Sequence, residues 1–274
     1  GAFESSSSDV GQFALQQKVR EGGATTSVDY TIAAVHYDTT MTGTGDAADG
    51  TVKMTFKDLR ETIGVPAAPD GSTPPMEFSV ASPSGAQDAT ITGLKPRAVN
   101  ELIAWFVSKP SLEAIKANKE QLKDKLRAAL PLFGNVSGTM SLDDMSVNTM
   151  MGVFGMQKLD VLVDMNGVVE NGAVREKFSI TGLKVPDMIV PPWASSLVPD
   201  KLTIDFNLAD FNLAAPAKLV IDNFDLTQEP PLKPEIESQL LQALLPKGAV
   251  SVSFGASEII AKIFDLKLEG SMTA

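Results

Sequence analysis

Alternation of apolar and polar residues is the commonest pattern along the chain. It occurs in four segments, which are residues 51–59, 158–165, 201–213 and 262–270. In the first of them, Val52, Met54 and Phe56 share one side and polar residues share the other. A period of two predicts antiparallel strands with one buried face and one face in water. In the third segment the alternation shifts by one residue at Phe211, which predicts a bulge or a tight bend.

Helical periodicity is confined to residues 97–107, 111–130 and 233–245. Apolar residues recur there at spacings of three and four, which makes one amphipathic stripe in each segment. Ser111 can serve as an N-cap, and Pro234 suits a first helical turn because its missing N–H is harmless there. These three segments are predicted to be the only substantial helices.

The same order of predicted secondary-structure elements occurs twice in the sequence. Leu130-Pro131 and Leu245-Pro246 each end a helical pattern, and a glycine, an alternating strand and a further strand follow in both places. The two copies are 115 residues apart, which exceeds the period of about 20–50 residues that solenoid repeats show. The repeated order of elements predicts a duplicated helix-plus-sheet unit. Coincidence is the alternative, since helices often end before proline and glycine.

The predicted fold class is therefore α+β. We expect a long, curved antiparallel β-sheet with amphipathic helices packed on its concave face, in two related helix-plus-sheet units. The predicted parts are an N-terminal β-rich part at 1–92, a first unit at 93–170 and a second unit at 171–274. Whether the N-terminal part is continuous with the rest, and whether the units form one sheet or two domains, stays open.

Composition narrows the function classes. The 274 residues are 43% apolar, as is usual for globular proteins, and carry a formal net charge of −11. That charge argues against nucleic acid as a partner and against electrostatic docking on anionic lipid headgroups. The chain has no cysteine, which removes thiol catalysis, thiolate metal sites and disulfides, and which fits a bacterial envelope protein.

The first residues, "GAFESSSSDV", contain neither an initiator methionine nor an apolar signal core. We expect a processed fragment, with any signal peptide or N-terminal anchor outside it. No stretch approaches the roughly 18 consecutive apolar residues of a membrane span.

The strings "VPPWASSLVP", "FNLAAPA" and "ALLPKG" carry a family resemblance. Residues 90 to 274 resemble an uncharacterised family of bacterial, mainly alphaproteobacterial, envelope proteins, the domain of unknown function 2125. The resemblance implies a periplasmic protein built largely of sheet, broadly similar to AsmA-like and lipid-binding groove proteins. It implies no catalytic residues.

Catalytic constellations are scarce. His36 is the only histidine, and we expect an ordinary strand histidine because no Gly-x-Ser-x-Gly elbow accompanies it. The loop "GTGDAADG", residues 43–50, is the best candidate ion site, but a plain hairpin loop is the expected alternative. Asp143 and Asp144 are expected to be solvated turn residues. We predict no enzyme activity, no metal and no cofactor.

Two features suit ligand binding. Six methionines cluster between residues 140 and 165, and they line either an adaptable apolar surface or an irregular core. In "VPDMIVPPWASSLVP", prolines bar a regular helix or central strand, so the apolar residues either contact a membrane or partner or pack over the sheet. The candidates for that contact are Met188, Ile189 and Trp193.

The sequence thus predicts a non-enzymatic periplasmic protein that binds or shuttles lipid, or another apolar small molecule, in a groove between helix and sheet. The candidate lining residues are Leu122, Leu126, Met140, Met151, Met156, Leu240, Leu244, Val252 and Phe254. One alternative is an envelope scaffold or assembly factor with a filled core and a membrane or protein partner. A second alternative is a hydrolase acting on an envelope polymer.

Overall fold

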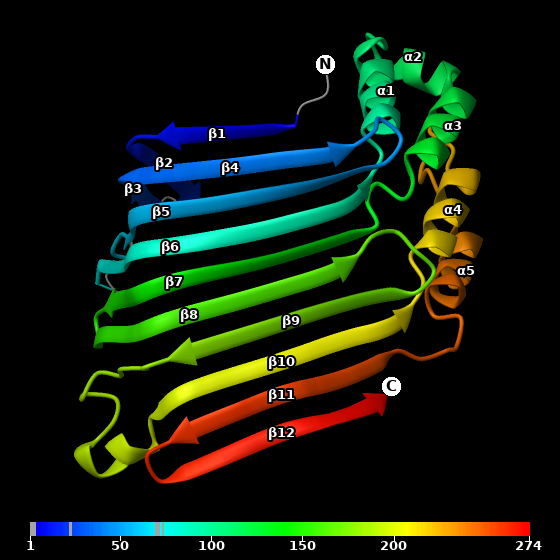
Figure 1. Ribbon diagram of the computed structural model, residues 1–274. Helices are drawn as coiled ribbons and strands as arrows, with labels where there is room; N and C mark the ends of the chain where they lie inside the picture. Colours follow the sequence, from blue (N-terminus) through cyan, green and yellow to red (C-terminus); the bar gives the residue numbers. More distant parts are fainter. Residues whose placement is uncertain (1–3, 22–23, 69–71, 73) are drawn as a thin grey trace.

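A computed structural model describes residues 4–21, 24–68, 72 and 74–274. Within these residues, one open and mostly antiparallel sheet of twelve strands dominates (Figure 1). Strand makes up 55% and helix 21%, so the fold is a sheet with helical insertions. The strands are β1 (Ser5–Val10), β2 (Phe13–Glu21), β3 (Ala24–Ile32), β4 (Ala34–Gly43), β5 (Ala48–Val65), β6 (Met76–Leu94), β7 (Asn135–Thr149), β8 (Gly152–Asn166), β9 (Gly172–Thr181), β10 (Pro199–Phe211), β11 (Ser251–Ala261) and β12 (Phe264–Thr273). The helices are α1 (Pro96–Val107), α2 (Leu112–Ala117), α3 (Lys119–Ala129), α4 (Ala214–Asn223), α5 (Pro234–Leu244) and the 3-10 helix η1 (Pro192–Leu197).

The sheet runs in the order β1-β4-β5-β6 and then consecutively to β12. β4 pairs with the first part of β5, β3 pairs with its second part, and β1 and β2 pair with β4 and β3 in turn. Segments 51–59 and 158–165 lie within strands, and segments 201–213 and 262–270 lie in β10 and β12 except for residues 212–213 and 262–263. All four strand predictions are confirmed to within two residues at one end. The sheet passes through all three predicted parts of the chain, and residue 92 lies inside β6.

Three aspartates bend or bulge the long strands. Asp58 in β5, Asp144 in β7 and Asp210 in β10 have φ values of 51°, 44° and 67°. Aspartate tolerates this left-handed conformation better than most residues, and one such residue kinks its strand. The bulge predicted before Phe211 is confirmed, since the β9–β10 register shifts between Ala209 and Phe211.

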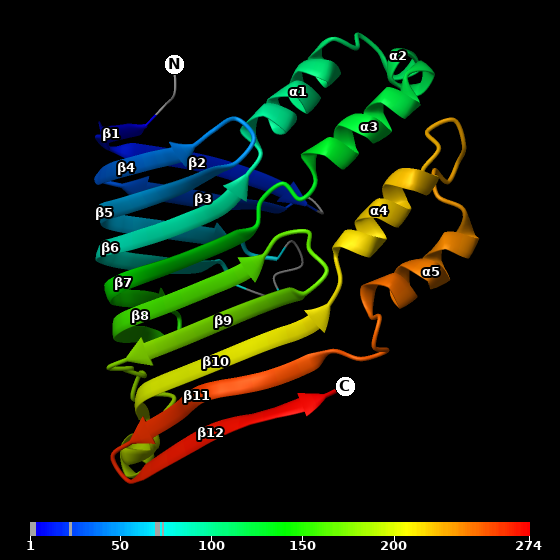
Figure 2. The same ribbon diagram turned by 45° about the vertical axis from the view of Figure 1, so that its right-hand side comes forward.

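The bend brings apolar side chains together on its inner side. Val35, Phe56 and Leu142 are buried and form a cluster, against which Leu59 and Met145, from beyond the bend, also pack. β2 and β3 lie behind the main sheet in Figures 1 and 2. The side of the sheet that carries Val35 and Phe56 is therefore the inside of the bend.

Helices α1 to α5 lie beyond one end of the strands, and η1 lies at the opposite end, between β9 and β10 (Figures 1 and 2). The main contacts of α1 to α5 are with one another. Arg127 of α3 donates to Asp222 of α4 at 2.7 Å, and Lys125 of α3 donates to Glu101 of α1 at 2.5 Å. The structure does not show the predicted packing of helices on a concave face of the sheet. The physical reason is connectivity, because α1–α3 join β6 to β7 and α4–α5 join β10 to β11, both at the same end of the sheet.

Helix predictions succeeded in part. α1 and α5 match segments 97–107 and 233–245, and Ser111 accepts the N–H of Ala114 as the predicted cap. Segment 111–130 is interrupted at Asn118, whose φ of −115° and ψ of 29° separate α2 from α3. The prediction of only three helices was wrong, since it missed α4. The first turn of α4 accommodates Pro216, and Asn212, one residue before the N-cap Leu213, accepts the N–H of Ala215 at 2.8 Å. No helix among the described residues is long and apolar enough to cross a membrane.

Candidate functional site

Cross-strand pairing aligns apolar side chains into four rows on the inner side of the bend. Directly opposed residues of antiparallel strands project to the same face, so the pairing register defines each row. The first row is Val10, Val35, Phe56, Gly85, Leu142, Leu159, Ile180, Leu202, Ile259 and Leu266. From β5 onward the second row is Met54, Gln87, Met140, Val161, Phe178 and Ile204, and the third is Val52, Ala89, Gly138, Val163, Glu176, Phe206, Phe254 and Gly270. The fourth is Gly50, Ile91, Val136, Met165, Val174, Leu208, Val252 and Met272. We call this surface the apolar face.

The middle of the apolar face is open. Met140 is 37% exposed, Phe178 36%, Val163 39% and Ile204 43%, whereas Phe56 in the first row is 5% exposed. The bend therefore covers the first row near β4 and β5 and leaves the second and third rows exposed at β7 to β10. Monomeric soluble proteins rarely expose a large contiguous apolar surface unless it binds a ligand, a membrane or another protein.

A hollow of about 180 Å³ lies at the β10–β12 side of the sheet. Register shifts in the β10–β11 and β11–β12 pairs fall at the same place, because residues near Gly255 have no direct partner. Its lining is mainly apolar, and it comprises Leu202, Thr203, Ile204, Phe254, Ser257, Glu258, Ile259, Leu266 and Leu268. The irregular pairing thus opens a small recess that lies beside the rows.

The opposite face of the sheet is polar. One of its rows is His36, Thr55, Ala86, Ser141, Asp160, Ser179, Thr203, Glu258 and Lys267. A neighbouring row begins Asp38, Lys53, Asp88 and Thr139. The sheet is therefore sharply two-sided, as the alternating sequence predicted.

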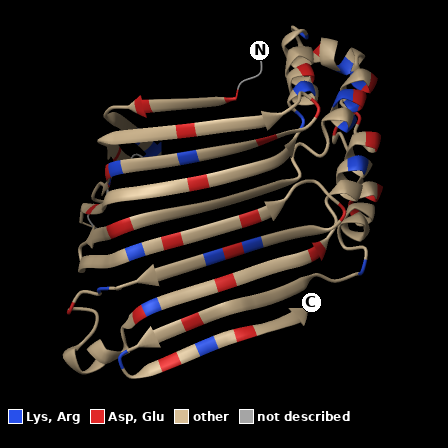
Figure 3. Cartoon of the chain, viewed as in Figure 1, with Lys and Arg blue, Asp and Glu red and all other residues tan. Residues whose placement is uncertain are grey.

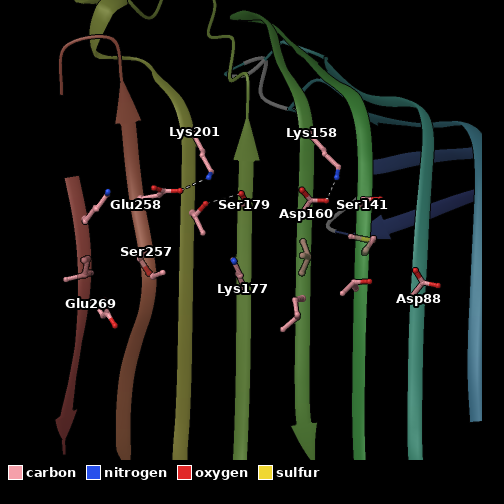
Figure 4. A pocket seen from close by; sticks show the side chains of 18 of the residues that line it. Asp88, Ser141, Lys158, Asp160, Lys177, Ser179, Lys201, Ser257, Glu258 and Glu269 are labelled. Atoms are coloured by element: carbon pink, nitrogen blue, oxygen red, sulfur yellow. Dashed lines mark hydrogen bonds and ion pairs between the residues drawn. The ribbon is translucent and has the colours of Figure 1, made fainter. Parts of the chain in front are cut away.

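A hollow of about 660 Å³ lies over the polar face, and two ion pairs form part of its lining (Figure 4). Lys201 reaches Glu258 at 2.6 Å and Lys158 reaches Asp160 at 3.0 Å. Acidic and basic residues also occur on neighbouring strands across the sheet (Figure 3). The hydrogen bond from Lys201 lowers the pKa of the Glu258 carboxyl. A lowered pKa suits an ion pair and opposes the raised pKa that a general acid needs at neutral pH.

Among the described residues of this face, Asp205 is a buried acidic residue that is 4% exposed. Arg175 binds it with two hydrogen bonds, from Nε at 2.9 Å and from one terminal nitrogen at 2.6 Å. The Arg175 hydrogen bond is the main reason why the pKa of Asp205 is lowered. Gly255 leaves room for the carboxylate, since a Cβ there would lie 2.9 Å from its Cγ. The pair is thus a structural feature of the sheet.

His36 lies on the polar face of β4 and contacts two carboxylates. Its Nδ1 is 2.8 Å from Asp9 and its Nε2 is 3.1 Å from Asp38. The hydrogen bond with Asp9 is the main reason why the pKa of His36 is raised, and that with Asp38 adds to it. These carboxylates are the ordinary partners that the sequence predicted for a strand histidine.

The two acidic segments singled out in the sequence, residues 43–50 and 143–144, lie in different kinds of structure. Residues 43–50 form the β4–β5 hairpin, as predicted, and Asp49 accepts the N–H of Gly93 at 2.8 Å. Asp143 and Asp144 are strand residues of β7, so their assignment to a turn was wrong. Asp143 accepts a hydrogen bond from Ser84 of the neighbouring strand at 2.8 Å. The described residues contain no group of three or more histidine, aspartate or glutamate side chains that could hold a metal.

The predicted lining residues fall into four separate places. Met140, Val252 and Phe254 lie in the rows of the apolar face, and Met156 lies opposite Met145 beyond the bend. Met151 is exposed in the β7–β8 turn. The remaining four, which are Leu122, Leu126, Leu240 and Leu244, lie on α3 and α5 beyond the strand ends. The structure therefore does not bring the helical and sheet candidates together into one groove.

The predicted contact loop connects β9 and β10. Met188 is 83% exposed, Trp193 78% and Ile189 42%. Pro186 holds the loop against the β7–β8 turn, since a Cβ on Gly152 would lie 2.8 Å from the proline ring. The apolar side chains thus project from an anchored loop instead of packing over the sheet.

Comparison of the chain with family models, with curated proteins and with solved structures finds no match. The arrangement itself defines an open antiparallel sheet with one apolar and one polar face.

Sequence reasoning missed several residues of this site. Phe178 and Ile204 lie side by side in the second row, and Glu176 lies in the third. Alternation carried a signal for Ile204, because Leu202 and Phe206 at two-residue spacing are both apolar. The signal for Phe178 was weaker, since only Ile180 on one side is apolar. Glu176 had no such signal, since a glutamate inside an alternating strand normally indicates the wet face.

Proposed function

We propose that the protein is a periplasmic lipid-binding or lipid-shuttling protein that holds an acyl chain, or another apolar ligand, against the apolar face. One observation carries the proposal, namely the exposed second and third rows around Met140, Val163, Phe178 and Ile204. No covalent chemistry is involved in this function.

Burial of apolar surface is the term that favours such binding. It contributes roughly 25 cal/mol for each Å² of apolar surface that the ligand and the apolar face remove from water. The ligand lies across strands β7 to β10, where the face is open, and the helices take no part in covering it.

Native mass spectrometry with organic extraction tests the proposal. Protein purified mildly from a lipid-containing host should carry a stoichiometric lipid. A double variant, Phe178→Ser with Ile204→Ser, should lose saturable binding of a fluorescent fatty acid. Leu162→Ser is the matched control, because Leu162 lies opposite Lys177 on the polar face of the same region.

Two results would overturn the proposal. One is a clean apo mass together with an absence of saturable fatty-acid binding. The other is a dimer, detected by light scattering, that the Phe178→Ser and Ile204→Ser double variant dissociates. In that case a second copy of the chain, and not a lipid, covers the apolar face.

A second candidate function rests on the loop at residues 188–193. An envelope scaffold would use its exposed Met188 and Trp193 to contact a membrane or a protein partner, while the sheet served as a rigid support. Exposed tryptophan is frequent at interfaces because one side chain offers a large apolar area and a polar N–H.

A further inference from the structure

Glu176 is the one acidic side chain in the four rows between β5 and β12. It lies directly between Val163 of β8 and Phe206 of β10, and Val174 and Phe178 precede and follow it on the same face of β9. Gln87, in the second row, is the only other polar side chain in that part of the face. A carboxylate at this position therefore has apolar neighbours on four sides within the face, while its outer side meets solvent.

Within the described part of the chain, the structure shows no ion pair or hydrogen bond to the Glu176 side chain. The two cationic residues next to Glu176 in the chain form no ion pair with it. Arg175 and Lys177 project to the polar face by strand alternation, and Arg175 is bound to Asp205. In the absence of a ligand, water solvates the Glu176 carboxylate, because its side chain is exposed.

An apolar ligand that covers this region removes that water. An ionised carboxylate without a partner in an apolar environment is strongly unfavourable. A cationic nitrogen offsets that cost, because it neutralises the charge and donates short, charge-assisted hydrogen bonds. A hydroxyl donates a hydrogen bond but leaves the charge in place, and an anionic headgroup adds repulsion.

We infer that the ligand of the apolar face is a cationic amphiphile, a long-chain amine or aminolipid, whose ammonium group binds Glu176. Its chain lies over Val163, Phe178 and Phe206. This inference rests on the proposed function, and it assigns to Glu176 the selection of the headgroup.

Three probes with the same twelve-carbon chain test it: dodecylamine and dodecyl sulfate below their critical micelle concentrations, and dodecanol below its solubility limit, all at pH 7. The wild-type protein should bind dodecylamine at least about tenfold more tightly than dodecanol. Dodecyl sulfate should bind most weakly. In Glu176→Gln the ratio of amine to alcohol affinity should fall close to one, while dodecanol binding is retained or improved.

Glu269→Gln is the control for general attraction, since the chain carries a net charge of −11 and Glu269 lines the hollow of the polar face. It should leave the preference for the amine unchanged. Equal binding of amine and alcohol by the wild-type protein would overturn the inference and leave the proposed function standing. A preference for the amine that survives in Glu176→Gln would overturn it too. Absence of binding by all three probes would overturn the proposed function itself.

Discussion

The ring of Phe56 in β5 lies over Gly85 of β6, its directly opposed neighbour. A Cβ on Gly85 would lie 2.2 Å from the Cζ atom of that ring, so no side chain fits there. Phe211 covers Gly172 in the same way between β10 and β9. In each pair, the phenylalanine ring occupies the space that a side chain on the glycine would need. The first pair, Phe56 and Gly85, lies on the inner side of the bend.

Gly85→Ala should destabilise the protein. The added methyl group forces the Phe56 ring out of its position, and such overpacking costs about 1–3 kcal/mol. Urea unfolding followed by circular dichroism measures the change. Gly270→Ala is the control, since a Cβ there meets nothing within 4 Å. Equal stability of the two variants would show that the Phe56 ring is free to move.

Arg175→Met should destabilise the protein by about 3 kcal/mol at pH 7, because it leaves the Asp205 carboxylate buried without its partner. Lys267→Met, which removes an exposed pair with Asp265 at 3.8 Å, should cost less than about 1 kcal/mol. Urea midpoints of both variants give the comparison. A change at Arg175 no larger than that at Lys267 would contradict the importance of the Asp205 pair.

The same pair predicts a pH dependence. The pKa of Asp205 in the folded protein lies below its ordinary value of 3.8, so the unfolded chain binds the proton more readily. The stabilisation is complete above pH 3.8 and is lost as the pH falls through the folded pKa. Asp205→Asn should remove this component of the acid dependence, which urea titrations between pH 7 and pH 2 measure. Identical acid profiles for the wild type and the variant would count against it.

The pKa of His36 should lie above its ordinary value of 6.5. The stabilisation from its contacts with Asp9 and Asp38 is complete below pH 6.5 and is lost as the pH rises through the raised pKa. NMR titration reports it directly, because His36 is the only histidine. Asp9→Asn should lower the pKa, whereas Asp88→Asn, on the same face, should leave it unchanged. An unshifted wild-type titration would refute the geometry around His36.

Trp193 should enter a lipid interface. The chain has two tryptophans, of which Trp105 is 8% exposed and Trp193 78% exposed. Phosphatidylcholine vesicles should therefore shift the fluorescence emission to the blue, and Trp193→Phe should abolish the shift. Trp105→Phe should preserve it. An emission spectrum that vesicles do not change would remove the membrane as the partner of this loop.

Strand predictions succeeded because they depend on local alternation. Val52, Met54 and Phe56 show in the sequence alone that they share a face, and the structure places them in three adjacent rows. Helix predictions were weaker at Pro216 and Asn118. Pro216 argued against a helix although it fits the first turn of α4, and the apolar periodicity continued through the break at Asn118 without a visible change.

The sequence by itself determined a sheet with one apolar and one polar side, since a period of two is a property of each strand alone. Only the tertiary structure decided which residues of different strands share a row, that the helices lie beyond the strand ends, and that the bend covers Phe56 but leaves Phe178 open. Those relationships depend on pairing register, which joins residues far apart in the chain, and on strand kinks such as that at Asp58. Glu176 shows the difference most clearly, because its apolar surroundings are supplied by β8 and β10 as much as by its own strand.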